Sequence, residues 1–149
     1  MMAYNVSRPI EGTEEDMTAT TPDTTLPRAR GDARPGHFLV GLALLAAAVA
    51  GAATAGTGVW SVAFWAVIPD VALLLAVGST TAPGQLPRRA VPAYNLLHAP
   101  ALPLVLLAVA ATGWLGAYWA VAALTWLAHI AIDRGCGYGQ RTPEGWQRG

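Results

Sequence analysis

The sequence contains no lysine and only one cysteine. All nine basic residues are arginine, which together with abundant alanine is typical of a GC-rich bacterial genome. The single cysteine, Cys136, excludes an intrachain disulfide and a CxxC metal site. Charged residues make up 12% of the chain, about half the usual share, and the net charge is zero. We therefore expect no nucleic-acid partner.

Charge is almost absent from a long central stretch of the chain. Residues 38–132 contain three charged residues, Asp70, Arg88 and Arg89, although the chain as a whole is 54% hydrophobic. By contrast, residues 1–37 hold six of the nine acidic residues and are rich in Thr and Pro. Such a segment cannot bury enough apolar surface to offset its chain entropy, so we predict a disordered polar tail over residues 1–37.

Four apolar runs, each about twenty residues long, follow this tail. Because about twenty apolar residues cross a bilayer as a helix, we predict an all-α, four-helix transmembrane bundle. The links between the first and second runs and between the third and fourth are short and uncharged, which predicts two helical hairpins. The predicted membrane domain is 38–133, with spans at about 38–56, 59–78, 93–112 and 114–133, followed by a short C-terminal tail at 134–149.

The first run admits a second interpretation. Its segment AVAGAATA, residues 48–55, places small side chains at the spacing of a signal-peptide cleavage site. A cleaved signal peptide normally begins close to the N-terminus and precedes a polar mature chain. Here a long polar leader precedes the run and three further apolar runs follow it, which favours an uncleaved first span.

The positions of the arginines predict the orientation. All nine lie in the N-terminal tail, in the connection at 79–92 or in the C-terminal tail, and four spans place these three segments on one side. The positive-inside rule assigns that side to the cytoplasm. We therefore expect a multi-pass protein of the bacterial inner membrane, with both termini cytoplasmic and the lipid bilayer as its surroundings. Protein partners and oligomeric state stay open.

One carboxylate interrupts the second apolar run near its middle. Placing Asp70 at that depth costs on the order of 3 kcal/mol on membrane-insertion scales, so the residue is a functional candidate that should face the bundle interior. Pro69, directly before it, lacks an amide hydrogen and opens the helix locally. The carbonyl groups freed in this way can serve the same site as the carboxylate.

Two polar pairs lie at similar depth in the later runs. Asn95 and His98 are three residues apart, and His129 and Asp133 are four apart, so each pair shares a helix face. A rise of about 1.5 Å per residue lets all three spans direct these side chains into one pocket open to the cytoplasm. Their oxygen and nitrogen atoms suit a divalent ion such as zinc, manganese or iron. The candidate metal ligands are Asp70, His98, His129 and Asp133, and the supporting polar residues are Asn95, Arg134 and Tyr138.

A non-enzymatic interpretation stands beside this one. Polar side chains in membrane helices often only hydrogen-bond between helices, and such a cluster can also assist the passage of protons or small solutes. Arg134 either pairs with Asp133 or extends to the lipid headgroups. The alternating glycines at 135–139 favour a helix C-cap over a phosphate-binding nest. Cys136 has no neighbouring histidine in the sequence to activate it as a nucleophile.

Four motifs carry a family resemblance. They are IPD at 68–70, YNLLH at 94–98 with ALP at 101–103, WLAHIAIDRGCGYG at 126–139 and RTPEGW at 141–146. These residues resemble a bacterial integral membrane family catalogued as domain of unknown function family 4260. The resemblance covers about residues 38–147 and implies kinship without an assigned activity. Gln140 departs from the apolar residue that the family usually has there.

A more distant similarity adds an implied activity. The order Asp, His and then His-x-x-x-Asp on successive membrane helices is similar to a LexA-binding, inner-membrane-associated family proposed to contain metal-dependent hydrolases. That similarity implies Asp70, His98, His129 and Asp133 as metal ligands. The family's additional histidines, including its His-Arg and Thr-His-Ser signatures, are absent from this sequence. A metal-dependent hydrolase and a non-enzymatic membrane protein are therefore the two functions to be distinguished.

Overall fold

The computed structural model describes residues 32–148, and most of the predicted disordered tail, 1–31, lies outside the described residues. The first helix begins three residues before the predicted span, with a proline in the first turn, where its missing amide hydrogen costs nothing. No strand occurs between residues 32 and 148; one isolated β-bridge joins Arg141 and Gln147. The helices are α1 (Pro35–Thr54), α2 (Val59–Val67), the 3₁₀ helix η1 (Ile68–Ala76), α3 (Val91–Leu97), α4 (Ala101–Ala111) and α5 (Ala117–Gly135).

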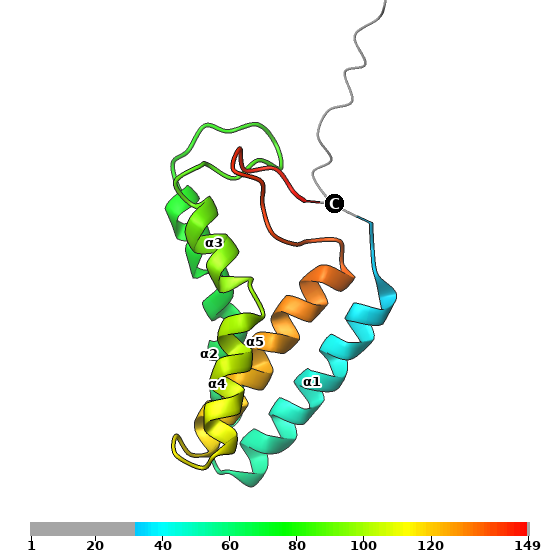
Figure 1. The fold of residues 1–149 in the computed structure, drawn as a ribbon, viewed down its shortest axis with the longest axis vertical. Helices are drawn as coiled ribbons and strands as arrows, with labels where there is room; N and C mark the ends of the chain where they lie inside the picture. The colour runs from blue at the N-terminus through cyan, green and yellow to red at the C-terminus, as the bar shows by residue number, and fades with distance from the viewer. Residues whose placement is uncertain (1–31, 149) are drawn as a thin grey trace, which may run out of the picture.

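These elements form a bundle of four helical rods (Figure 1). The first rod is α1, the second is α2 continued by η1, the third is α3 continued by α4, and the fourth is α5. Residues 55–58 join the first two rods and residues 112–116 join the last two, so the chain makes two hairpins. The predicted all-α, four-helix bundle of two hairpins is confirmed.

Helix α5 is the most enclosed element of the bundle. It packs along α1 and also contacts α2, α4 and η1. Glycines allow the close approach of α1 and α5: a Cβ at Gly41 would lie 2.8 Å from the backbone nitrogen of Ile132, and one at Gly135 would lie 2.5 Å from the backbone nitrogen of Phe38. Small residues that let backbones approach are typical of helix packing in membranes.

Three helical stretches of the described chain are long and apolar enough to cross a membrane: Pro35–Thr54, Val59–Ala76 and Val91–Ala111. They correspond to the first three predicted spans. The fourth predicted span corresponds to α5, which falls outside this set because its last turns carry a histidine, an aspartate and an arginine. Large apolar side chains such as Leu39, Leu74 and Val105 are exposed on the outer rods. The apolar outer surface indicates a lipid bilayer as the environment of the protein.

The second rod changes its helix type beside a predicted site residue. The α-helix ends at Val67, and η1 continues for nine residues as a 3₁₀ helix with Pro69 in its first turn and Asp70 next. Runs of 3₁₀ helix beyond three or four residues are uncommon and often mark a functional position. Pro69 therefore coincides with a change to a tighter helix and not with an opening of the helix.

The third rod, in the second hairpin, is interrupted beside another predicted site residue, His98. Helix α3 ends at Leu97, and α4 begins at Ala101 after Pro100, which has no amide hydrogen to donate. The indole Nε1–H of Trp126 donates to the Leu97 carbonyl at 2.7 Å, so α5 satisfies a group that the break leaves free. His98 lies at this break.

The C-terminal segment is docked rather than extended. After α5 it returns to the end of the bundle that holds the start of α1 and the connection at 79–90, whereas the two short turns lie at the opposite end (Figure 1). The Leu86 N–H donates to the Gly145 carbonyl at 2.9 Å. The Asn95 side chain accepts from the Arg141 N–H at 2.6 Å and donates to the Arg141 carbonyl at 2.9 Å. Residues 136–148 thus form part of the folded structure.

Candidate metal centre

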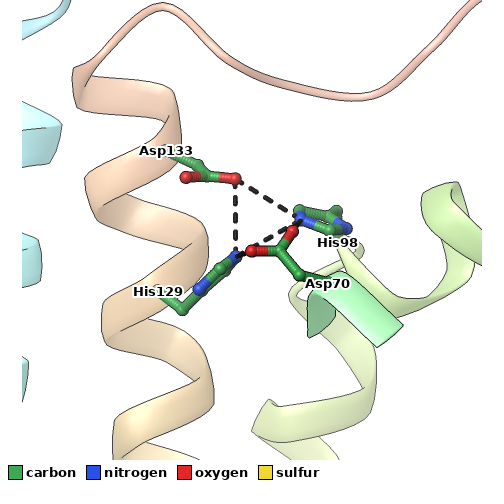
Figure 2. Close-up of side chains that lie close together, drawn as sticks. All are labelled: Asp70, His98, His129 and Asp133. Carbon is green, nitrogen blue, oxygen red and sulfur yellow. Dashed lines mark hydrogen bonds and ion pairs between the residues drawn. The ribbon is translucent and has the colours of Figure 1, made fainter. Parts of the chain in front are cut away.

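Four side chains from three rods meet at one point near this end of the bundle (Figure 2). Asp70 comes from η1, His98 from the break between α3 and α4, and His129 and Asp133 from successive turns of α5. Each offers one oxygen or nitrogen atom, and these atoms all lie within 4.8 Å of one another. The four are also the only histidine and acidic residues in the sequence between positions 38 and 143.

Both histidines face both carboxylates through Nε2. His98 Nε2 lies 3.4 Å from Asp133 Oδ2 and 3.6 Å from Asp70 Oδ1. His129 Nε2 lies 3.5 Å from the same Asp133 oxygen and 3.8 Å from Asp70 Oδ2. The two Nε2 atoms are 3.4 Å apart. Asp133 therefore presents one oxygen to both rings, whereas Asp70 presents a different oxygen to each.

Tyr94 fixes the orientation of His98. His98 Nδ1 lies 3.0 Å from the Tyr94 carbonyl, and a carbonyl only accepts, so Nδ1 carries a hydrogen and a neutral ring would present its Nε2 lone pair to the cluster. The Tyr94 ring also stacks on the imidazole with 3.9 Å between centroids, and the Arg141 guanidinium lies over the same ring. The sequence interpretation missed Tyr94, although its position four residues before His98 on one helix was a usable signal.

The cluster is closed on one side and open on the other. The exposed fraction of the side chain is 2% for His98, 14% for His129, 24% for Asp133 and 42% for Asp70. The histidines are thus held inside the bundle, while Asp70 borders the surface.

A helix cap holds the α5 end of the site. Gly137 has a φ of +82°, and its N–H donates to the Arg134 carbonyl at 3.2 Å. The next N–H, from Tyr138, donates to the Asp133 carbonyl at 2.8 Å. This pair of bonds is a Schellman motif, so the predicted glycine C-cap is confirmed. The cap fixes the backbone of Asp133, one of the four clustered residues.

The three supporting residues lie outside the cluster. Asn95 binds the backbone of Arg141, and so ties the C-terminal segment to α3. Arg134 and Tyr138 line a separate pocket beyond the end of α5. Cys136 follows α5 as its C-cap residue and is not part of the cluster.

The fold and the cluster together define a small helical membrane protein with four converging Asp and His side chains. Residues 39–149 match the family described as a domain of unknown function (DUF4260), and the chain belongs to that family. No curated protein and no solved structure matches the chain. The similarity to the LexA-binding hydrolases therefore gains no support from these comparisons.

Proposed function

We propose that this protein binds one divalent metal ion through Asp70, His98, His129 and Asp133 and uses it for hydrolysis. The observation that carries the proposal is the convergence of every histidine and acidic residue between positions 38 and 143. Each ionisable side chain within a membrane domain is costly. Two carboxylates and two neutral imidazoles in contact also repel one another unless a metal ion or a proton lies among them.

The spacing of the four groups supports a single ion. Zinc binds nitrogen and oxygen ligands at about 2.0–2.2 Å in a tetrahedron, whose edges are then roughly 3.3–3.6 Å long. The three separations among His98 Nε2, His129 Nε2 and Asp133 Oδ2 are 3.4, 3.4 and 3.5 Å, and with one Asp70 oxygen all four atoms lie within 4.8 Å of one another. His98, His129 and Asp133 would hold the ion, and the more exposed Asp70 would leave the fourth position open to a water molecule, as a catalytic zinc site requires.

The chemistry of the donors also supports a metal. Two imidazoles and two carboxylates suit zinc, manganese or iron, and the cluster contains no thiolate that would favour copper(I). Histidines that bind metals commonly donate their other ring N–H to a carbonyl or carboxylate. The hydrogen bond from His98 Nδ1 to the Tyr94 carbonyl is a contact of this kind.

Asp70 is the group that we assign to the reaction itself. When bound, a divalent ion polarises a substrate oxygen and lowers the pKa of a water molecule. His98, His129 and Asp133 hold the closed side, and the more exposed Asp70 borders the side from which a substrate arrives. In the proposed hydrolysis Asp70 accepts a proton from the attacking water as the water oxygen bonds to the electrophilic atom. The bond to the leaving group breaks, and Asp70 returns the proton to it.

The same proposal includes a location. The arginine-bearing segments within residues 32–148 lie at one end of the bundle (Figure 1), and the positive-inside rule supports placing that end in the cytoplasm. We infer a multi-pass protein of the bacterial inner membrane. The metal centre then lies near the cytoplasmic surface, so its substrates reach it from the cytoplasm or from the inner leaflet.

Elemental analysis of detergent-purified protein tests the metal. We expect about one zinc, manganese or iron per chain in the wild type and less than a tenth of that in His129→Ala. His37→Ala is the matched control, because it removes the one histidine that lies outside the cluster, and should keep the ion. Circular dichroism must show that all three proteins are folded. A metal-free wild type, purified without chelators, would refute the proposal.

The non-enzymatic alternative rests on the same distances. Separations of 3.4–3.8 Å also permit a shared proton between an imidazolium and the carboxylates. That cluster would serve helix packing or the passage of protons or small solutes. It predicts no stoichiometric ion, and loss of folded protein when His129 becomes alanine. The two functions therefore give opposite results in one set of samples.

A further inference from the structure

A second polar site lies beyond the end of α5, outside the metal cluster. It is a pocket of about 210 Å³ formed by the residues before α1, the end of α5 and the C-terminal segment. Three arginines and one aspartate line it, which leaves a net positive charge. These charged residues are Arg34, Arg134, Arg148 and Asp32.

Backbone bonds bring these distant arginines together. The Arg34 N–H donates to the Gly135 carbonyl at 2.9 Å, which fixes the start of α1 against the end of α5. The Arg148 N–H donates to the Gln140 carbonyl at 3.0 Å, which folds the C-terminal segment back over the same place. The positive pocket is therefore a product of the tertiary fold and not of a local run of charges.

Size and charge both point to a phosphate group. Pockets for drug-sized ligands usually enclose roughly 300–1,000 Å³, so this smaller one suits a compact anion. Guanidinium groups bind phosphate through paired, charge-assisted hydrogen bonds, which makes arginine a preferred residue for this ligand. The Tyr138 side chain also lines the pocket.

The pocket also lies at the depth of lipid headgroups. Arg34 directly precedes the apolar helix α1, and Arg134 is the last residue but one of α5. His129 of the cluster lies five residues before Arg134, about 7.5 Å deeper along the helix axis. A phosphate held at the end of α5 would therefore lie about one and a half helical turns from His129 along the helix axis.

We infer that the pocket of Arg34, Arg134 and Arg148 binds a phosphate group, and that phosphorylated amphiphiles are the substrate class of the neighbouring centre. The second part rests on the proposed hydrolytic function. The first part does not, because anion binding needs only the arginines. Phosphate in the pocket comes either from a lipid headgroup or from a soluble phosphate compound.

Calorimetry on the detergent-purified full chain tests the pocket with three probes: inorganic phosphate, dioctanoyl phosphatidic acid and dioctanoyl phosphatidylcholine. We expect phosphatidic acid to bind more tightly than phosphatidylcholine. Its Kd should rise about tenfold or more in Arg134→Gln and in Arg148→Gln, because each loses a charge-assisted contact. Arg88→Gln, which removes an exposed charge on the 79–90 connection and not in the pocket, should stay within about twofold. Inorganic phosphate that binds as tightly as the lipid identifies a soluble source, and weaker binding identifies a headgroup.

Three results would overturn the inference: unchanged binding in both pocket variants, an equal loss in Arg88→Gln, or phosphatidylcholine that binds as tightly as phosphatidic acid. Metal content is measured in the same samples and should not change in any arginine variant. A metal-free chain that still binds phosphate refutes the proposed hydrolysis but keeps the pocket. A chain that contains metal but does not bind phosphate refutes the pocket but keeps the proposed hydrolysis.

Discussion

Replacing each carboxylate of the cluster by its amide should separate a ligand from a group that acts on substrate. Asp133→Asn and Asp70→Asn are the same chemical change at two positions of one site. The Asp133 oxygen lies 3.4 and 3.5 Å from the two Nε2 atoms, close to the tetrahedral edge that zinc requires. Asp70 uses a different oxygen toward each ring, at 3.6 and 3.8 Å, and is nearly twice as exposed. We therefore expect Asp133 to contribute more to metal affinity.

The size of the difference follows from typical metal-binding energies. Four ligands of a structural zinc site together supply about 10–16 kcal/mol, or roughly 2.5–4 kcal/mol each. Loss of one such ligand in Asp133→Asn should weaken metal binding by about a hundredfold to a thousandfold. For Asp70→Asn we expect about tenfold, because water can replace an exposed carboxylate. This variant should keep metal at micromolar concentrations and lose any hydrolytic activity, since an amide cannot accept a proton.

Competition with a fluorescent zinc chelator in detergent measures both affinities on the same scale. His37→Ala serves again as the unaffected control. Equal losses in the two variants would refute the assignment of Asp70 to the exposed, reactive side. A greater loss in Asp70→Asn than in Asp133→Asn would reverse the roles of the two carboxylates.

Other perturbations test packing and docking. Gly135→Ala should destabilise the fold by about 1–3 kcal/mol in denaturant titrations, since its Cβ would meet the Phe38 backbone at 2.5 Å; Gly36→Ala, with nothing within 4 Å, should be neutral. Asn95→Ala removes both side-chain bonds to the Arg141 backbone, so trypsin should cleave after Arg141 faster than in the wild type. A chelator should lower the unfolding temperature, because free metal at a hundred times its Kd stabilises a binding protein by about 2.7 kcal/mol.

The sequence predicts the bundle well because each step depends on local information. Run length gives the helices, and short uncharged links give the hairpins. The sequence predicts the helix breaks only in part: Pro69 indicates one, but the interruption at Pro100 is not predicted, and the expected third span is one helix over 93–112. Proline in a membrane helix leads to a kink or to a break depending on what satisfies the freed carbonyls. Here Trp126, from another rod, makes that contact.

For the site, too, the sequence predicts what depends on single residues but not what depends on the packing of the helices. A carboxylate or imidazole in an apolar run is costly at any position, so Asp70 and His129 could be identified without knowing their neighbours. Their separation in space depends on how the hairpins pack. The docked C-terminal segment was predicted as a short tail, because the bonds of Leu86 to Gly145 and of Asn95 to Arg141 leave no periodic pattern in the sequence.

The division of the cluster between the hairpins gives the metal a structural consequence. Asp70 belongs to the first hairpin, whereas His98, His129 and Asp133 belong to the second. Three ligands on one hairpin can hold an ion before the hairpins pack, and Asp70 can join only afterwards. Since the proposed reaction needs Asp70, an unpacked chain could bind metal but not hydrolyse a substrate. The reaction would thus occur only in the assembled bundle. The arginine pocket also forms only there, because it needs Arg34, directly before α1 of the first hairpin.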